Sequence, residues 1–480
     1  MVFSSPAFLF AFLPVVLAAY FIARPAWRNM VLLAFSLLFY ACGETVYTLL
    51  MLVSITCNYL AARIIRQTDS PQFRKRIVIA GITGNLLMLG YFKYAGFIMQ
   101  NLYQAGFPLF GTAGPPQDIH LPIGISFFTF QAMSYLIDIY RGGTLRSVRF
   151  IDCAVYISLF PQLIAGPILR YHQIAEQIRS RSISRQIFSR GIQRFIIGLG
   201  KKVLLADSAG FIADTLFAEP STHVSVLMAW LGVLAYALQI YFDFSGYSDM
   251  AIGLGRLFGF EFPENFNTPY ISRSIREFWQ RWHISLSTWF RDYLYIPLGG
   301  NRLGPRRTYV NLWIVFVLCG LWHGAGWNFI AWGVLHGLYL VMERLGGGRW
   351  LIRLWRPLQH VYVLVLVLIG WVFFRTENLT AAGSWLLRMA GVPAEYAMRS
   401  SALAAFDPGR LSLLAFGIVF CLPIGRWCAT RMDRIRAHET ARWKPAVVDW
   451  VMTGSLIGLF LLCTAVVAST TYQPFIYFRF

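Results

Sequence analysis

The sequence predicts a single all-α integral membrane protein that crosses the bilayer many times. Of its 480 residues, 57% are hydrophobic and 13% are charged, whereas an ordinary soluble domain has about 25% charged residues. About a dozen apolar segments approach the length of roughly 20 residues that a helix needs to cross a bilayer. No linker or internal repeat separates them, so we expect one membrane domain over residues 1–480.

The apolar segments follow one another along the whole chain. Read with a window of about 20 residues, they lie near 7–23, 29–42, 44–62, 77–98, 121–140, 195–217, 224–242, 308–322, 326–343, 360–375, 411–424 and 448–468. The first segment lacks a basic region in front of it and is followed by further segments. We therefore expect it to stay in the protein as a helix rather than to be removed as a signal peptide.

Residues 150–169, "FIDCAVYISLFPQLIAGPIL", form a further apolar segment of a different kind. Arg149 precedes it and Arg170 follows it, and two prolines and a glycine interrupt it. A full span would place basic residues on both sides of the membrane, against the usual distribution. We expect a re-entrant hairpin whose irregular backbone is buried in protein.

The positive charge is concentrated in the loops between the apolar segments. The formal net charge is +20, with 42 Lys and Arg against 22 Asp and Glu. The basic clusters fall on one side of the membrane if the other segments span, and the alternate loop 99–120 has no Lys or Arg. Because Lys and Arg collect in cytoplasmic loops, both termini are predicted to lie outside the cytoplasm. This distribution explains the charge without a nucleic-acid partner.

The seven cysteines show no C-x-x-C spacing, so neither a disulfide framework nor a zinc site is indicated.

The longest stretch between apolar segments, 243–307, is rich in aromatic residues and in charges of both signs. Within it, apolar residues at spacings of three and four predict one continuous amphipathic helix. These residues are Ile275, Phe278, Trp279, Trp282, Leu286, Trp289, Phe290 and Tyr293. His283 falls at the edge of this stripe, one turn from Gln280 and Ser287, and so at the border between apolar and polar surroundings. The alternative is an interfacial histidine that pairs with a neighbour.

His323 lies in the apolar stretch "CGLWHGAGWNFIAWGVLHG", residues 319–337. It follows Arg307 by about fifteen residues, which at 1.5 Å per helical residue places it about 20–25 Å into the bilayer. Gly324 and Gly326 then break the helix, and irregular backbone at that depth needs a protein-lined cavity. Ionisable groups inside membranes commonly face a bundle interior or a substrate path. The alternative is a histidine that only joins two helices by a hydrogen bond.

The second histidine of this stretch, His336, lies between Gly333 and Gly337 in a regular apolar helix, where a hydrogen bond between helices is the favoured explanation. The zinc motif H-E-x-x-H and the nucleophile elbow G-x-S-x-G are both absent from the sequence. General acid–base catalysis by a neutral imidazole remains as the chemistry open to these histidines. Acyl transfer to a hydroxyl group requires such a base.

Several long motifs, in order, resemble the membrane-bound O-acyltransferase family in its bacterial alginate O-acetylation branch. They are "LPIGISFFTFQAMSYLIDIYRG", "FPQLIAGPILR", "YFDFSGYSDMAIGLGRLFGF", "FNTPYISRSIREFWQRWHISLSTWFRDYLYIPLGGNR", "GLWHGAGWNFIAWGVLHG" and the terminal "FIYFRF". The resemblance implies a ring of helices around a central funnel, with a catalytic core over about 121–343. It also implies that His323 is the catalytic histidine and that His283 is the second signature polar residue.

The candidates for supporting roles at that site are Trp322, Asn328, Asp292 and His336. Asp292 either orients the histidines or pairs with Arg291 and its neighbours, and the second role is the commoner one for such a charge. In the aromatic C-terminal tail, the resemblance suggests that Tyr477 relays the acyl group. The alternative is that this tail only anchors the chain at the outer interface.

The resemblance further implies a membrane O-acyltransferase that uses acetyl-CoA or a related acyl thioester from the cytoplasm, with no bound cofactor and no metal. The acceptor would be an exported polysaccharide such as alginate. The protein would lie in the bacterial inner membrane in contact with lipid, with periplasmic termini and periplasmic acetyltransferase partners. The alternative function is a non-catalytic acyl-group transporter or a scaffold, in which the same histidines gate a conduit.

Overall fold

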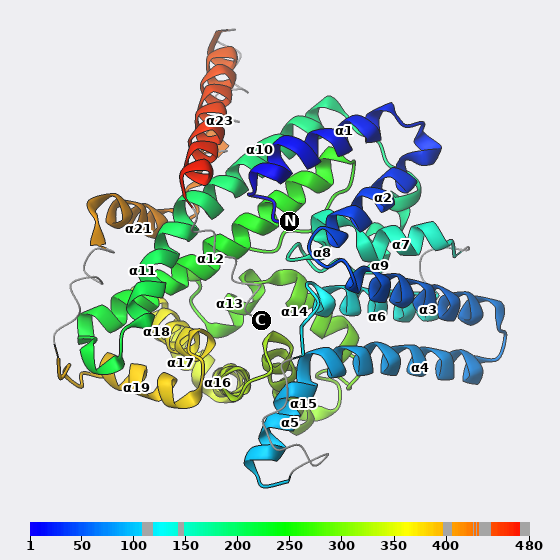
Figure 1. The fold of residues 1–480 in the computed structure, drawn as a ribbon. Helices are drawn as coiled ribbons and strands as arrows, with labels where there is room; N and C mark the ends of the chain where they lie inside the picture. The colour runs from blue at the N-terminus through cyan, green and yellow to red at the C-terminus, as the bar shows by residue number, and fades with distance from the viewer. Residues whose placement is uncertain are drawn as a thin grey trace.

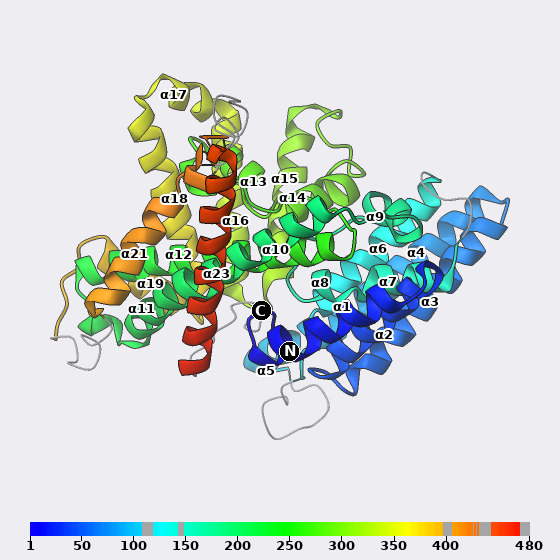
Figure 2. The same ribbon diagram turned by 90° about the horizontal axis from the view of Figure 1, so that it is seen from above.

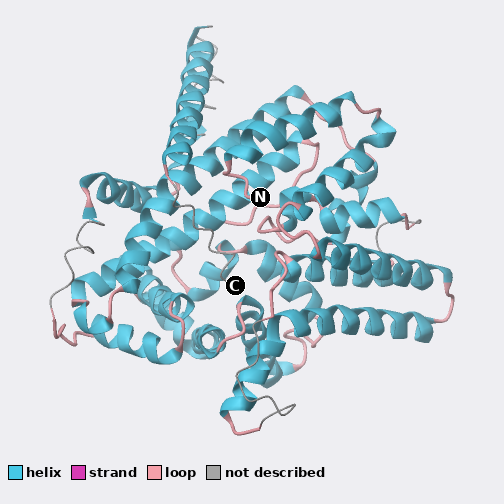
Figure 3. Ribbon diagram, in the orientation of Figure 1, coloured by secondary structure: helices cyan, strands magenta, loops and turns pink. Residues whose placement is uncertain are grey.

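The structure is a computed structural model that describes residues 1–107, 119–142, 148–396, 406–425, 427–428, 430–431 and 443–470. Every regular element in these ranges is a helix, and no strand occurs among them (Figure 3). The predicted all-α class is confirmed. Tyr477 lies outside the described residues.

Each apolar segment predicted from the sequence contains a helix. In the first half of the chain these are α1 (Leu13–Ile22), α2 (Arg28–Ala41), α3 (Tyr47–Gln67), α4 (Pro71–Leu89), α5 (Ala95–Gln104), α6 (Ile125–Arg141), α7 (Phe150–Ser158), α8 (Phe160–Leu163), α9 (Tyr171–Arg179), α10 (Arg185–Gly200) and α11 (Asp207–Ala218). Two π turns, η3 (Gly90–Tyr94) and η5 (Lys201–Ala206), join α4 to α5 and α10 to α11.

The second half begins with the longest helix, α12 (Val226–Leu257). It is followed by α13 (Ile275–Arg281), α14 (Ile284–Phe290), the π turn η8 (Arg291–Tyr295), α15 (Gly304–His323), α16 (Trp327–Met342), α17 (Gly348–Arg353), α18 (Arg356–Arg375), α19 (Leu379–Met389), α21 (Pro408–Phe420) and α23 (Trp443–Ser469).

Five helical runs among the described residues are long and apolar enough to cross a membrane. They are Tyr47–Gln67, Pro71–Gln104, Val226–Leu257, Arg356–Arg375 and Val447–Ser469. Two shorter apolar helices, Phe8–Ile22 and Pro408–Phe420, accompany them. The other predicted segments form helices that are shorter or more polar than these runs.

The longer helices surround the shorter ones. In Figure 1, α10 and α12, then α18, α16 and α15, then α6 and α3 lie around α13 and α14, which occupy the middle of the view. Figure 2 shows the same arrangement from above and places α5 at the same edge of the molecule as the N-terminus. α23 extends away from the other helices in Figure 1. The arrangement agrees with the predicted ring.

Glycines bring α10 and α12 into close contact. A Cβ atom at Gly198 would lie 2.5 Å from the carbonyl oxygen of Gly246, and one at Gly253 would lie 2.7 Å from that of Gly191. These pairs are seven residues apart on both helices, so they recur on one face after two turns. The two backbones therefore touch along this face.

The prediction that an apolar helix ends near residue 242 is wrong, because α12 continues to Leu257. The added part carries two buried carboxylates, and both are paired with cations. Asp243 pairs with Lys202 at 2.9 Å, and Asp249 pairs with Lys201 at 2.7 Å and with an arginine of α10. Paired charges can be buried, so the acidic residues do not end the helix.

The segment 150–169 is interrupted, as the prediction of a re-entrant hairpin requires. α7 ends at Ser158, the short α8 follows, and residues 164–170 are irregular. Apart from the two residues at its start, every residue from 152 to 169 is buried. At 1.5 Å per residue, the nine residues of α7 span about 14 Å. This is too short to cross a bilayer.

The prediction of one continuous amphipathic helix over 275–293 is also wrong. The chain forms α13 and α14, with a break at Trp282 and His283. His283 has a φ of 43°, in the left-handed region, which few residues other than glycine adopt. The apolar stripe itself was predicted correctly, because all eight of its members are buried.

Candidate functional site

His323 is the last residue of α15, and the chain turns sharply after it. Gly324 and Gly326 have extended backbone, and a Cβ atom at Gly324 would lie 2.2 Å from the ring of Phe329. α15 and α16 also cross closely, since a Cβ atom at Gly320 would lie 2.3 Å from the carbonyl oxygen of Phe329. The predicted helix break is confirmed, and it leaves His323 at a buried helix end with 7% of its surface exposed.

A cavity of about 460 Å³ reaches His323. Its wall combines His323 and Trp322 from the end of α15 with Lys93 from the π turn η3 and Ser126 from the start of α6. Residues 43–44, 120–125, 127 and 164 line the rest of it. Cavities of about this volume hold small ligands or parts of larger ones. The cavity therefore gives a ligand access to the imidazole of His323.

A carboxylate and an imidazole line another part of the same cavity. The carboxylate of Glu44 accepts hydrogen bonds from Nε2 of His120 and from the backbone N–H of Ile123, each at 3.1 Å. The ring of Tyr47 stacks on that of His120 with a centroid separation of 5.2 Å. The side chain of His120 is 61% exposed, whereas that of Glu44 is 6% exposed. The cavity thus joins an exposed imidazole to a buried one.

Aromatic rings hold the imidazole of His323 in place. The ring centroids of Trp322, Trp332 and Phe374 lie 4.9, 5.1 and 5.0 Å from that of His323. The ring nitrogens make no hydrogen bond with any residue that the structure describes. Both nitrogens are therefore available to a ligand in the cavity.

His283 is held by Asn265, which sequence reasoning did not identify. The oxygen Oδ1 of Asn265 accepts from the backbone N–H and the hydroxyl of Ser285, at 3.2 and 2.9 Å, and lies 3.1 Å from Nδ1 of His283. The amide Nδ2 of Asn265 donates to Ser248 at 3.0 Å. An amide oxygen can only accept, so Nδ1 of His283 must carry the proton. The remaining nitrogen, Nε2, is buried without a partner among the described residues and can act only as an acceptor while the ring is neutral.

Trp322 contacts both imidazoles. Its ring centroid lies 4.9 Å from that of His323 and 6.3 Å from that of His283. It also packs on Phe130, which stacks on Trp289 with a centroid separation of 3.8 Å. The structure thus brings together three of the predicted site residues, with the indole of Trp322 linking the two histidines.

His336 and Asn328, both in α16, have structural partners instead. Nε1 of Trp279 donates to Nδ1 of His336 at 3.3 Å, so the proton of this imidazole is on Nε2 and no basic nitrogen is free. Nδ2 of Asn328 donates to the carbonyl oxygens of Phe373 and Thr376, at 3.2 and 2.8 Å. These contacts join α16 to α13 and to the end of α18. Neither residue lines the cavity.

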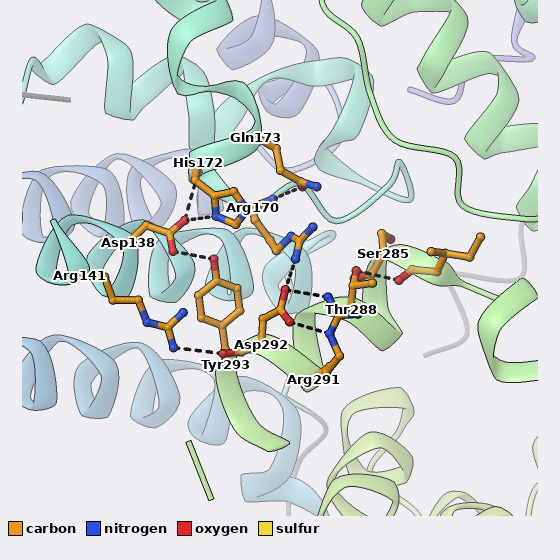
Figure 4. A network of polar contacts seen from close by, with 11 residues as sticks. Asp138, Arg141, Arg170, His172, Gln173, Ser285, Thr288, Arg291, Asp292 and Tyr293 are labelled. Atoms are coloured by element: carbon orange, nitrogen blue, oxygen red, sulfur yellow. Dashed lines mark hydrogen bonds and ion pairs between the residues drawn. The ribbon is translucent and has the colours of Figure 1, made fainter. Parts of the chain in front are cut away.

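Asp292 does not line the cavity and belongs to the polar network that Figure 4 shows. Its carboxylate pairs with Arg170 and accepts a hydrogen bond from Nε of Arg291 at 2.7 Å. Burial alone would raise the pKa of Asp292, but the hydrogen bonds and charges of the two arginines outweigh it, so its pKa lies below the usual value. Next to it, Asp138 accepts from the hydroxyl of Tyr293 at 2.8 Å and from Nδ1 of His172 at 2.9 Å. Of the two roles predicted for Asp292, the structure shows the pairing with arginines.

No group of three or more His, Cys, Asp or Glu side chains that could hold a metal ion occurs among the described residues. The polar side chains that line the cavity carry imidazole, ammonium, carboxylate and hydroxyl groups.

Comparison with known proteins assigns this chain to a family. Residues 140–347 match MBOAT, the membrane-bound O-acyltransferase family. A Pseudomonas aeruginosa protein named "Probable alginate O-acetylase AlgI" is 40% identical over 533 aligned residues, which cover 100% of both chains. The chain belongs to the membrane-bound O-acyltransferase family. This acyltransferase is also 41% identical to a protein of the same name from Azotobacter vinelandii, again over 100% of both chains. A "Peptidoglycan O-acetyltransferase" of Helicobacter pylori is 34% identical over 100% of this chain and 98% of its own.

The candidate site contains residues that the sequence analysis did not identify. Lys93 lies outside the expected core of about 121–343, yet it lines the cavity beside His323. The sequence did contain an indication of this role, because Lys93 is an ionisable residue inside an apolar segment. Such residues are costly to place in a membrane and commonly mark functional sites. Glu44, His120 and Asn265 gave no comparable signal. Their sequence surroundings do not show that Glu44 and His120 line the cavity or that Asn265 contacts His283.

Proposed function

We propose that this membrane O-acyltransferase takes acetyl groups from cytoplasmic acetyl-CoA, across a bacterial inner membrane, for the O-acetylation of an exported polysaccharide such as alginate. The observation that carries the proposal is the cavity that reaches the imidazole of His323, whose ring nitrogens are free of protein hydrogen bonds. The names of the relatives, alginate O-acetylase and peptidoglycan O-acetyltransferase, support an acetyl group and a glycan acceptor.

In the proposed reaction His323 is the general base. It accepts the proton of the acceptor hydroxyl as the hydroxyl oxygen attacks the thioester carbonyl carbon. The C–S bond then breaks, the acetyl group remains on the acceptor oxygen as an ester, and the thiolate of CoA leaves and takes up the proton from His323. Every atom of the two substrates appears in the two products. A positioned general base contributes typically about 10²–10⁴-fold to such a rate.

The hydrogen bond of His283 limits it to positioning a reactant rather than polarising one. With the proton fixed on Nδ1 by Asn265, its Nε2 is a hydrogen-bond acceptor. A neutral His283 therefore cannot polarise the thioester carbonyl, which would need a donor at Nε2. Because Nε2 is buried and His283 does not line the cavity, we propose that His283 positions a reactant indirectly, through the indole of Trp322, which contacts both imidazoles. The donor would approach this region from the cytoplasm, and the acceptor would use the cavity at His323.

The test is transfer of label from radiolabelled acetyl-CoA in inverted membrane vesicles that carry the wild type or His323→Ala at matched abundance. We expect the substitution to lower the initial rate by about 10²-fold or more, because it removes the base. The matched control is His336→Phe, which removes another buried imidazole that lies off the cavity. The control should transfer label at nearly the wild-type rate. Equal rates in the wild type and His323→Ala would contradict the proposal and favour a transporter or scaffold.

Tyr477 is the proposed relay residue, and it lies outside the described residues. If its hydroxyl accepts the acyl group before a periplasmic acetyltransferase removes it, Tyr477→Phe should abolish polysaccharide acetylation and leave no labelled acyltransferase chain. The ring is retained in this variant, so anchoring of the tail is unaffected. Unchanged acetylation of the polysaccharide in Tyr477→Phe would exclude the relay.

A further inference from the structure

We propose that Lys93 and Tyr94 form a clamp that positions His323 by binding the open carbonyl groups at the end of α15. The inference rests on the proposed function, because it assigns a purpose to holding the imidazole of His323. Lys93 and Tyr94 are positioning residues in this proposal. Neither is assigned a contact with the reacting atoms.

The last turn of α15 has carbonyl groups that its own helix cannot satisfy. The last four carbonyls of any α-helix lack an intrahelical partner, and here the chain turns away immediately after His323. The hydroxyl of Tyr94 donates to the carbonyl oxygen of Leu321 at 2.8 Å. Nζ of Lys93 donates to the carbonyl oxygens of Trp322 and His323 at 2.5 and 3.2 Å. Two adjacent residues thus bind three successive carbonyls.

The ammonium group of Lys93 has the donors and the charge that the carboxyl end of α15 requires. It has three donors, and its third neighbour is the hydroxyl oxygen of Ser126 at 3.4 Å. Only 9% of Lys93 is exposed, and it forms no ion pair with a carboxylate of the described residues. The partial negative charge at the carboxyl end of a helix attracts a cation. The end of α15 therefore takes the place of a counterion.

The π turn η3 explains how two adjacent side chains reach the same helix end. Gly90–Tyr94 forms this turn inside the long apolar run Pro71–Gln104. π turns inside α-helices are rare and occur frequently at functional sites. Without the turn, α4 and α5 would form one regular helix, on which adjacent side chains point about 100° apart. The local widening allows Lys93 and Tyr94 to contact α15 together.

The clamp matters because His323 stands at the end of its helix. A terminal turn with unpaired carbonyls frays, and fraying would move the imidazole relative to a substrate in the cavity. A displacement of about 1 Å can cost about 10²-fold in rate. Since Lys93 lines the same cavity as His323, the clamp acts where the acceptor is proposed to bind.

The first experiment measures kcat and KM for acetyl transfer in Lys93→Met, Lys93→Arg and Tyr94→Phe. We expect kcat to fall by about 10–100-fold in Lys93→Met, with KM changed by less than about threefold, because geometry rather than binding is lost. Lys93→Arg keeps the charge and the donors and should recover part of the loss. The matched control is Tyr20→Phe, which removes another tyrosine hydroxyl that donates to a carbonyl oxygen, that of Phe258, away from the cavity. Its kcat should stay near the wild-type value.

The second experiment does not depend on activity. Hydrogen exchange followed by mass spectrometry, on protein in lipid nanodiscs, reports the opening of the segment 318–326. We expect faster exchange there in Lys93→Met and Tyr94→Phe, and wild-type exchange in Tyr20→Phe. If the wild type does not use acetyl-CoA, the proposed function fails, and this exchange still decides whether the clamp exists. Wild-type exchange in both clamp variants, or faster exchange with unchanged kcat, would overturn the proposal.

Discussion

The three imidazoles that are buried in the described part of this acyltransferase differ in what their ring nitrogens contact. Nδ1 of His283 donates to Asn265, whereas Nδ1 of His336 accepts from Trp279. The ring of His323 has no hydrogen bond with a described residue. A neutral imidazole has one acceptor nitrogen, so that of His336 is occupied and those of His283 and His323 are free. Hydrogen bonding, rather than burial, therefore separates the two site histidines from the structural one.

At the residue scale we predict that Asn265 controls the activity through the tautomer of His283. Asn265→Ala removes the nearer of two oxygen atoms beside Nδ1–H, since Oγ of Ser285 lies 3.5 Å from Nδ1. It should lower kcat by up to about 10²-fold, because the ring loses its orientation. Asn265→Asp keeps an oxygen at this position and should retain much more of the rate. Acetyl transfer at matched membrane abundance measures both. Equal losses of kcat in the two variants would show that this oxygen does not fix the tautomer of His283.

At the scale of elements, apolar periodicity predicted where helices form but not where they are interrupted. The glycines after His323 gave a visible signal for a break, and the structure confirms it. The break at His283 gave none, because Asn265 produces it from outside the segment. The backbone N–H of Ile284 donates to the carbonyl oxygen of Asn265 at 2.9 Å, and Ser285 donates to its side chain. Asn265 thus caps the first turn of α14, which no periodicity within 275–293 can reveal.

Two further differences between the sequence patterns and the structure have a similar cause. α12 continues past Asp243 because Lys202, forty-one residues earlier in the chain, neutralises it. Lys93 is accepted in an apolar helix because the end of α15 supplies its partners. In each case a distant residue reverses the local preference. Sequence patterns therefore predicted where helices form, whereas the roles of His323 and His283 stay predictions. Long-range polar contacts decide where helices end and which groups surround these histidines.

The glycine contact between α10 and α12 predicts that a larger side chain on this face lowers the stability of the protein. A Cβ atom at Gly198 would lie 2.5 Å from the carbonyl oxygen of Gly246 and 2.7 Å from the backbone nitrogen of Met250. Neither backbone atom can move without separating the helices, and overpacking typically costs about 1–3 kcal/mol. We expect Gly198→Ala to lower the melting temperature in detergent by several degrees. Gly84→Ala is the control, because a Cβ atom there meets nothing within 4 Å. Equal melting temperatures of the two variants would contradict the close packing.

At the scale of the whole molecule, the cavity and the arginine network lie at opposite ends of α6. Ile125, at the first turn of α6, lines the cavity, whereas Arg141, at its last turn, donates to the backbone carbonyl oxygen of Asp292. The seventeen residues between these ends span about 25 Å, close to the hydrocarbon thickness of a bilayer. If the arginine-rich end faces the cytoplasm, as basic residues usually do, the cavity opens toward the periplasm.

This orientation can be tested with native and introduced cysteines. Cys42 is exposed and precedes the cavity residues Gly43 and Glu44. A membrane-impermeant maleimide should label it in intact spheroplasts. Lys75→Cys, made in a Cys42→Ser background, replaces an exposed lysine in the first turns of α4 and should be labelled only in inverted vesicles. Cys57 is exposed within the apolar helix α3, where lipid protects it from the reagent, and serves as the internal control. The reverse pattern would turn the cavity toward the cytoplasm, and the proposed acceptor path through it would have to become the path of the thioester donor.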